Sequence, residues 1–110
     1  MQNETNKTDT IAALDAMKSM ADSPTLIHVL KFAARMEAKL EKNRHKGSRE
    51  GWIKNHPWEL VERMLDETVE VQQCFIHGGR EINFSDGNDL ADECADVANF
   101  CMMIADRATV

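Results

Sequence analysis

The most constraining feature of the sequence is a helical apolar stripe that carries acidic residues where a buried side chain is expected. From Pro57 onward, apolar residues recur at steps of three and four, the period of a helix with one buried face. Position 67 of this stripe is Glu67, and Glu70 follows one turn later on the same side. Glu62 and Arg63 are expected on the opposite, solvated side. The apolar members of the stripe are Leu60, Met64, Val71, Cys74 and Phe75.

The stretch DECAD, residues 92–96, repeats this arrangement. Glu93 and Asp96 are three residues apart and belong to an apolar stripe that continues through Val97, Phe100, Met103 and Ile104. Four carboxylates brought together in a weakly solvated site repel one another, so we expect a cation between them. Oxygen ligands without His or Cys favour Mg²⁺, with Mn²⁺ as a substitute, over zinc. The Glu-x-x-His pairs of di-iron bundles do not occur in the sequence.

The rest of the chain reads as four helical stretches, with no convincing strand. Ser23 and Pro24 are expected to open the second helix, and Asn88 to cap the fourth. Residues 45–57, rich in glycine and proline, are expected to form a loop, and residues 80–88 a connection. The helices are expected at about 10–21, at about 24–43, from Pro57 to the HGG of residues 77–79, and from Asn88 to about Arg107.

These stretches predict an all-α fold, a bundle of about four helices. We expect a flexible N-terminus over residues 1–9 and a single helical domain over residues 10–110. A chain of 110 residues buries only a modest core. Oligomerisation, as a homodimer or homotetramer, is therefore expected to complete the bundle.

Composition and charge limit the cellular location and the classes of binding partner that we expect for the protein. No apolar run approaches the roughly 18 residues of a membrane span, and the N-terminus lacks the features of a signal peptide, so we expect a cytoplasmic protein without membrane contact. Cys74, Cys94 and Cys101 lack CxxC spacing and are expected to be reduced core residues. A formal net charge of -6 argues against nucleic acid as a partner.

Basic residues are concentrated in one part of the chain. Eight of the 13 Lys and Arg residues fall between Lys31 and Lys54, whereas the chain from Glu59 onward is mostly acidic. This segregation is equally compatible with two solvated faces that attract each other and with an anionic ligand bound through cations.

The two acidic stretches resemble the signature of a known family. DETVE, residues 66–70, followed after 22 residues by ECAD, resembles the EExxE and ExxD motifs of the MazG-like all-α nucleoside triphosphate pyrophosphohydrolases. KFAARMEAKLEKNRHKG and GW are similar to the preceding helix and loop of small phage and bacterial members, so the resemblance covers roughly residues 29–108. Asp66 departs from it, because the family usually has Glu at that position.

The resemblance implies a fold, a reaction and a ligand set. The reaction is hydrolysis of a nucleoside triphosphate to the monophosphate and pyrophosphate, in nucleotide-pool control or house-cleaning, with a deoxynucleotide as the expected substrate. Glu67, Glu70, Glu93 and Asp96 carry over as Mg²⁺ ligands, and Glu67 or Glu70 is the expected proton acceptor. Asn99, one turn beyond Asp96, is a candidate for binding the sugar or base, or else an ordinary polar residue at the rim.

Other substrate contacts are expected from the basic and aromatic residues. Lys46 and Arg49, in the glycine-bearing loop, are the best candidates for the outer phosphates, with Lys39, Lys42 and Lys54 as weaker ones; exposed, solvated cations are the alternative for each. Either tryptophan could stack on a base, and Trp52 is the better candidate of the two, with Trp58 the weaker. The alternative for both is a place in the core or in a subunit interface, where tryptophan more often lies.

A rival hypothesis from another functional class remains open. The chain would be a non-catalytic helical dimer, an adaptor or regulator whose acidic residues only determine pairing. It predicts no turnover and no dependence on divalent ions. Within the enzyme hypothesis the sequence does not choose the base, and dUTP, dCTP, purine deoxynucleotides and damaged nucleotides all fit.

Overall fold

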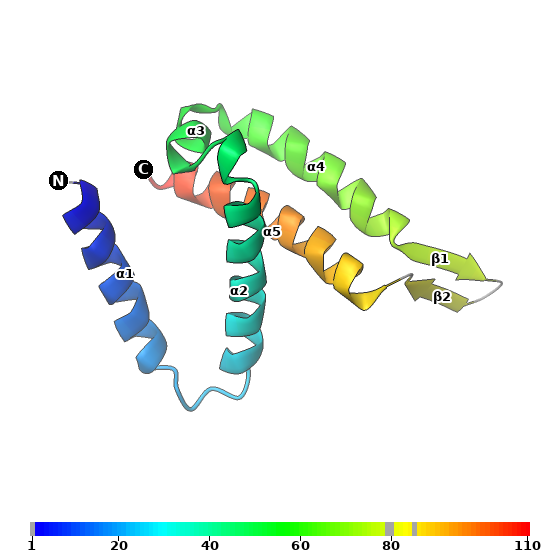
Figure 1. Ribbon diagram of the computed structural model, residues 1–110, viewed down its shortest axis with the longest axis horizontal. Helices are drawn as coiled ribbons and strands as arrows, with labels where there is room; N and C mark the ends of the chain where they lie inside the picture. Colours follow the sequence, from blue (N-terminus) through cyan, green and yellow to red (C-terminus); the bar gives the residue numbers. More distant parts are fainter. Residues whose placement is uncertain (1, 79–80, 85) are drawn as a thin grey trace. The chain divides into compact units, whose positions relative to one another are not determined.

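The computed structural model describes residues 2–78, 81–84 and 86–110, with side chains described for residues 7–75 and 86–110. Helices make up most of these residues, which agrees with the all-α class expected (Figure 1). The elements are α1 (Gln2–Lys18), α2 (Leu26–Lys42), the 3₁₀ turn η1 (Arg44–Lys46), α3 (Arg49–Lys54), α4 (Pro57–Gln73), β1 (Phe75–Gly78), β2 (Glu81–Phe84) and α5 (Gly87–Ala108).

The described chain divides into two compact units, residues 1–31 and residues 32–110. In the first unit α1 begins at Gln2, ahead of the position expected from the sequence, and α2 begins at Leu26. Ser23 Oγ accepts a hydrogen bond from the backbone N–H of Thr25 (3.4 Å), so Ser23 closes a turn before the helix rather than opening it directly. The single domain over residues 10–110 and the flexible residues 1–9 stay predictions.

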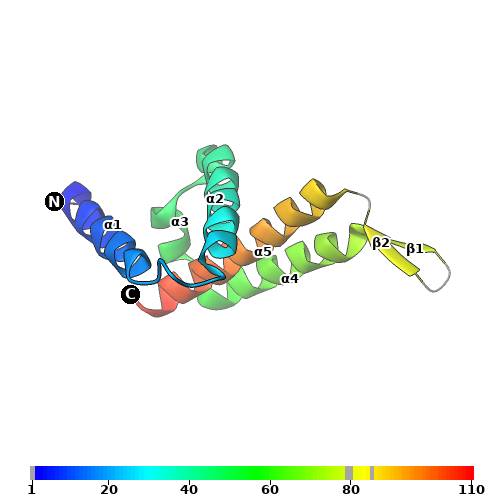
Figure 2. The same cartoon turned by 90° about the horizontal axis from the view of Figure 1, so that it is seen from below.

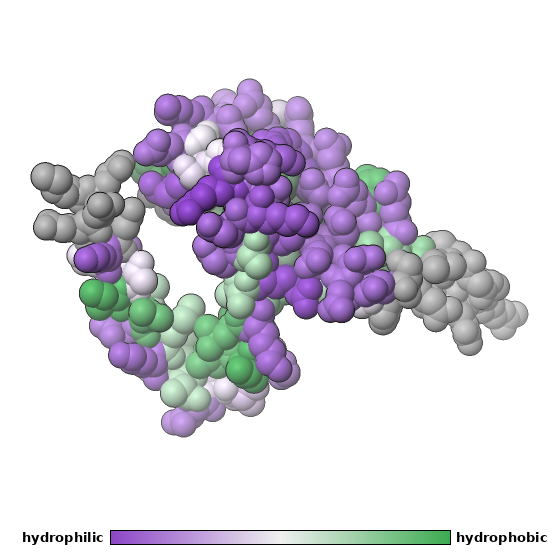
Figure 3. Space-filling model, viewed as in Figure 1, coloured by the Kyte–Doolittle hydropathy of each residue, from purple (hydrophilic) through white to green (hydrophobic). Residues whose placement is uncertain are grey.

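The first unit leaves much of its apolar surface uncovered. Figure 3 shows green, apolar surface over α1 and the beginning of α2. The large apolar side chains of this unit that are more than half exposed are Ile11, Leu14, Met20, Ile27 and Val29.

The core of the second unit lies between α4 and α5. These helices run antiparallel and side by side in both views (Figures 1 and 2). Leu60 on α4 and Ala95 on α5 are fully buried, and Cys74 is buried at the end of α4. The part of α2 in this unit contacts α5 through the Arg35–Asp92 ion pair (2.9 Å). The pairing of α4 with α5 thus sets the relative position of the two acidic stretches.

The cysteines only partly follow the prediction of reduced core residues. All three are free thiols. Cys74 is buried and Cys94 is half-buried, but Cys101 is exposed, and its Sγ lies 3.3 Å from Met64 Sδ. The core position expected for Cys101 is therefore wrong, because its position on α5 leaves the side chain open to solvent.

A short β-hairpin replaces the connection expected between the last two helices. The predicted third helix stops at Gln73, and β1 pairs antiparallel with β2 in a register that joins Phe75 to Phe84 and Gly78 to Glu81. The expectations of no strand and of helix continuing to residues 77 and 78 were wrong, and Gly79 lies outside the described residues. The strands contain the aromatic and β-branched residue types that favour extended chain.

Two further local predictions differ from the structure. The expected loop over residues 45–57 contains α3, which Ser48 precedes and in which Glu50 complements the positive end of the helix. The cap of α5 is Asp86, whose Oδ1 accepts the backbone N–H of Asn88 at 2.7 Å, rather than Asn88 itself. Within the described residues, no helix has the length and apolar character required to cross a bilayer.

Candidate metal centre and its pocket

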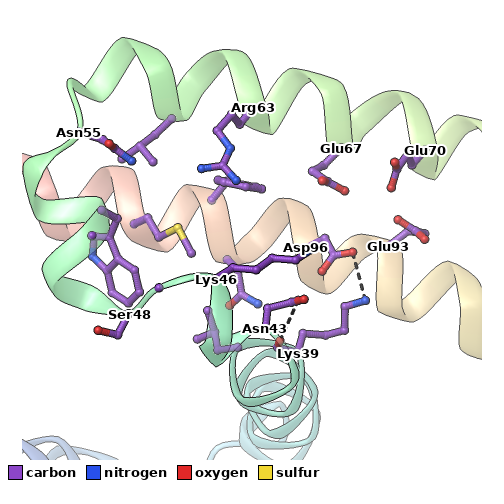
Figure 4. Close-up of a pocket in the computed structure, with 18 residues that line it drawn as sticks. Lys39, Asn43, Lys46, Ser48, Asn55, Arg63, Glu67, Glu70, Glu93 and Asp96 are labelled. Atoms are coloured by element: carbon purple, nitrogen blue, oxygen red, sulfur yellow. Dashed lines mark hydrogen bonds and ion pairs between the residues drawn. The ribbon is translucent and has the colours of Figure 1, made fainter.

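The four acidic residues singled out in the sequence meet in space. Glu67 and Glu70 come from α4, and Glu93 and Asp96 from α5; one carboxylate oxygen of each lies within 4.8 Å of all the others. The i, i+3 spacing puts each pair on one face of its helix, and the antiparallel packing of α4 and α5 turns these faces toward each other. Figure 4 shows the four carboxylates gathered between the two helices. Asp66 is exposed and does not belong to this acidic cluster.

The acidic cluster holds more negative charge than its surroundings balance. Burial raises the pKa of Glu67 to about 7, helped by a hydrogen bond with Glu70 and by the charges of Glu70, Asp96 and Glu93. The pKa of Glu93 is also raised, first by burial and then by its hydrogen bond with Glu70. Proximity of like charges therefore makes protons compete with cations for this cluster.

One lysine partly compensates the cluster. Lys39 Nζ, on α2, lies 3.2 Å from Asp96 Oδ2. Burial lowers the pKa of Lys39, but the hydrogen bond to Asp96 and the charges of Asp96, Asp92 and Glu93 outweigh this and raise it overall. Lys39, one of the weaker phosphate candidates, is thus engaged with a carboxylate of the cluster.

The donor atoms of the cluster fit a hard divalent cation. All four ligand groups are carboxylates, the type that Mg²⁺ and Mn²⁺ prefer. Glu93 Oε2 is buried and has no hydrogen-bond partner among the described residues. A buried acceptor is rarely left in this state, because its desolvation is then uncompensated. A cation held by the four carboxylates would supply the missing partner.

The acidic cluster forms one end of a pocket of about 630 Å³. The opposite end is lined by Trp52 of α3 and by apolar side chains, among them Leu60, Phe100 and Met103. Lys46 lines the pocket from the segment that precedes α3 (Figure 4). The pocket therefore combines an anionic end, a basic side chain and an apolar, aromatic end.

The residues predicted to bind substrate fall into two groups. Lys46, Trp52 and Asn99 line the pocket, whereas Arg49 does not. The Arg49 guanidinium instead binds the Asp106 carboxylate through two hydrogen bonds, Nε to Oδ2 at 2.8 Å and Nη2 to Oδ1 at 3.1 Å. Arg49 is therefore a structural partner of α5 here. Lys42, Lys54 and Trp58 are exposed and lie outside the residues that line this pocket.

Asn99 is more deeply buried than a rim residue. Its side chain is 5% exposed, and Nδ2 donates a hydrogen bond to the Met36 carbonyl at 3.1 Å. The amide thus joins α5 to α2. Oδ1 is left without a hydrogen-bond partner among the described side chains and backbone.

Arg63 is a pocket residue that the sequence prediction missed. It was expected on the solvated side of α4, yet it lines the pocket, and its guanidinium carbon lies 5.0 Å from the centre of the Phe100 ring. Figure 4 shows Arg63 pointing from α4 into the pocket. Arg63 lies four residues before Glu67, and this spacing places both side chains on one face of α4. The spacing could have indicated from the sequence that Arg63 lines the same pocket as Glu67.

Comparisons of the chain with models of known protein families, with curated proteins and with solved structures give no match. The MazG-like resemblance therefore depends on the residues themselves and stays a hypothesis. The function has to be inferred from the acidic cluster and the pocket.

Proposed function

We propose that the protein is a Mg²⁺-dependent nucleoside triphosphate pyrophosphohydrolase of the MazG-like type. It would hydrolyse the bond between the α and β phosphates of a nucleoside triphosphate, releasing the monophosphate and pyrophosphate. The observation that carries this proposal is the clustering of four carboxylates from two helices at one end of a nucleotide-sized pocket. A deoxynucleotide substrate and a role in nucleotide-pool control or house-cleaning belong to the same proposal.

Glu67, Glu70, Glu93 and Asp96 would hold the metal, with Mn²⁺ as a possible substitute for Mg²⁺. When bound, such an ion lowers the pKa of a coordinated water and offsets the charge of phosphate oxygens. The raised pKa values of Glu67 and Glu93 support the assignment. Burial first, and then the neighbouring carboxylates, disfavour the ionised form of these groups, and a bound cation would favour it. Lys39 would keep the Asp96 carboxylate oriented through their 3.2 Å ion pair.

The chain's own side chains have separate tasks in this proposal. Glu67 or Glu70 accepts the proton of the attacking water, because both carboxylates lie in the cluster where the scissile phosphate would be held. Lys46 and Arg63 bind phosphate oxygens, since both line the pocket and neither is in an ion pair among the described residues. Arg63 takes the phosphate-binding role that the sequence suggested for Arg49, because the Arg49 guanidinium is already bound by Asp106.

The apolar end of the pocket suits a base. Trp52 forms part of its wall, and an aromatic face stacks on any base, which supports nucleotide binding without choosing the base. The lining of the pocket, which includes both the acidic cluster and Trp52, suits a ligand that carries phosphates at one end and an aromatic base at the other.

The test is a pyrophosphate-release assay over all standard and several modified nucleoside triphosphates with Mg²⁺. We expect turnover of at least one deoxynucleotide and its loss in EDTA. Glu67→Gln should abolish turnover, whereas Asp66→Asn, the matched control on the neighbouring carboxylate outside the cluster, should retain it. Orthophosphate as the first product, or equal effects of the two substitutions, would overturn the proposal.

One observation favours the alternative of a non-catalytic helical adaptor or regulator. Trp58, Leu65 and Val69 are exposed along α4, with 59%, 52% and 49% of their surface accessible, and such side chains suit a protein interface. The same assay separates the two functions, because the adaptor requires neither turnover nor a divalent ion.

A further inference from the structure

Asp106, in the last turn of α5, accepts hydrogen bonds from two side chains of α3. Besides the two bonds from Arg49, its Oδ2 accepts the indole N–H of Trp52, with 2.8 Å between Nε1 and Oδ2. The carboxylate is the less exposed partner, at 27% against 60% for the Arg49 side chain. Asp106 therefore joins α3 to α5 through a bidentate ion pair and an indole hydrogen bond at once.

This anchor acts on a short helix. The helix has six residues, too few to be stable by itself. It follows Gly47, whose φ of +136° lies in a region that side chains rarely adopt. At its other end the Asn55 carbonyl accepts a hydrogen bond from Arg107 Nε at 3.3 Å. Contacts with the end of α5 thus determine where α3 lies.

The indole hydrogen bond also orients the Trp52 ring. Trp52 has one polar atom, and Asp106 engages it, so the rest of the ring is free to form the pocket wall. Asp106 itself does not line the pocket. The hydrogen bonds from Arg49 and Trp52 lower the pKa of Asp106, so that it is ionised, and accepts these bonds, at neutral pH.

We propose that Asp106 is a positioning residue that holds Trp52 as the base-stacking wall of the pocket. It acts through the indole N–H and through α3, without touching the substrate. This inference depends on the proposed function, because it assigns the aromatic end of the pocket to the base of the nucleotide. It adds a residue outside both acidic motifs to the determinants of substrate affinity.

The kinetic test compares Asp106→Ala with Asp92→Ala. Both substitutions remove an Asp–Arg ion pair from α5 and insert the residue with the best helix propensity, but the Asp92–Arg35 pair does not involve a pocket residue. We expect Asp106→Ala to raise KM by about fivefold or more with kcat within about twofold, because ground-state binding of the base is lost. Asp92→Ala should leave KM unchanged, although both variants lose stability.

A spectroscopic arm observes Trp52 directly. In a Trp58→Phe background Trp52 is the only tryptophan. Adding Asp106→Ala to it should shift the emission to longer wavelength and increase acrylamide quenching, whereas adding Asp92→Ala should change neither. Should Asp106→Ala not fold, Trp52→Phe provides the test, because it removes the N–H donor and leaves the Arg49–Asp106 pair; KM should rise even though an aromatic ring remains.

A double-substitution arm separates positioning from a general structural role. In a Trp52→Ala background, Asp106→Ala should cause no further rise in KM, because the ring that it positions is gone. Additive effects on KM, or an unchanged KM for Asp106→Ala, would overturn the inference while wild-type turnover upholds the proposed function. Absence of wild-type turnover would overturn both the inference and the proposed function. The two failures are distinguishable, because this one is measured on wild type alone, whereas failure of the inference is measured on the variants.

Discussion

Replacement of Glu93 by Gln tests whether the acidic cluster is a metal site or a structural feature. The substitution preserves the shape of the side chain and removes one of four neighbouring charges. In the metal-free protein it should relieve repulsion among the carboxylates. In the presence of Mg²⁺ it should remove a ligand. The two effects have opposite signs, which makes the substitution diagnostic.

Coulomb's law gives the scale of the first effect, and mass action gives the scale of the second. At the 4.8 Å limit between the carboxylate oxygens, two unit charges repel by about 1 kcal/mol in water and about 3 kcal/mol at an effective dielectric constant near 20. Lys39 attracts Glu93 and offsets part of this. We therefore expect a net gain on the order of 1 kcal/mol, or about 4–8 °C in Tm. Mg²⁺ at about ten times its Kd should stabilise wild type by about 1.4 kcal/mol, or about 6–11 °C.

The assay is thermal melting of wild type and Glu93→Gln at pH 8, in EDTA and in excess Mg²⁺. This pH lies above the pKa of about 7 of Glu67, so that carboxylate is mostly ionised. The variant should melt at the same or a higher temperature than wild type in EDTA and lose most of the Mg²⁺ shift and the turnover. Glu62→Gln, an exposed carboxylate on α4 outside the cluster, is the control and should keep both. A Glu93→Gln protein that is destabilised yet still responds to Mg²⁺ would refute the metal site.

Three further predictions address the cluster, the pocket and the assembly. The folded-state pKa of Glu67 is raised above 4.5 to about 7, so the native state binds more protons than the unfolded state between these pH values. The stability of the metal-free protein should therefore fall by on the order of 1 kcal/mol as pH rises from 5 to 8. Chemical denaturation in EDTA measures this change, and a rise in stability over the same range would contradict the prediction. Trp52→Ala should raise KM by about tenfold, whereas Trp58→Ala, at an exposed position, should not; equal KM values for both would leave Trp52 structural. Light scattering at micromolar concentration should give a homodimer or homotetramer that covers exposed apolar residues such as Leu65, and a fully active monomer would refute this.

Much of the helical framework could be predicted because its signals are local. Pro57 begins α4 as expected, and α2 and α5 end within a residue or two of the predicted positions, since proline, terminal charges and apolar periodicity act over one or two turns. The same periodicity placed Glu67 and Glu70 on the face of α4 that carries the acidic cluster, where Glu67 is half-buried and Glu70 is exposed. The acidic cluster was thus visible in the sequence as two pairs of carboxylates on apolar stripes, while its role as a metal site stays a prediction.

Short elements were missed because their local signals are ambiguous. The chain from Phe75 to Phe84 has apolar runs of only a few residues, which do not distinguish a helix end from a strand. The six residues of α3 are too few to show a helical period, and two nearby glycines indicated a loop. In both segments, packing and pairing with the rest of the chain select the conformation.

The environment of each site residue was decided only by the tertiary structure. Arg49 and Lys46 are both basic residues near glycine, yet Arg49 binds Asp106, which is 57 residues away, and Lys46 lines the pocket. Arg63 and Asn99 likewise acquired their positions from Phe100 and from the Met36 carbonyl. Periodicity determines which face of a helix a residue occupies, but the partner on that face comes from a distant segment whose approach depends on how all the helices pack.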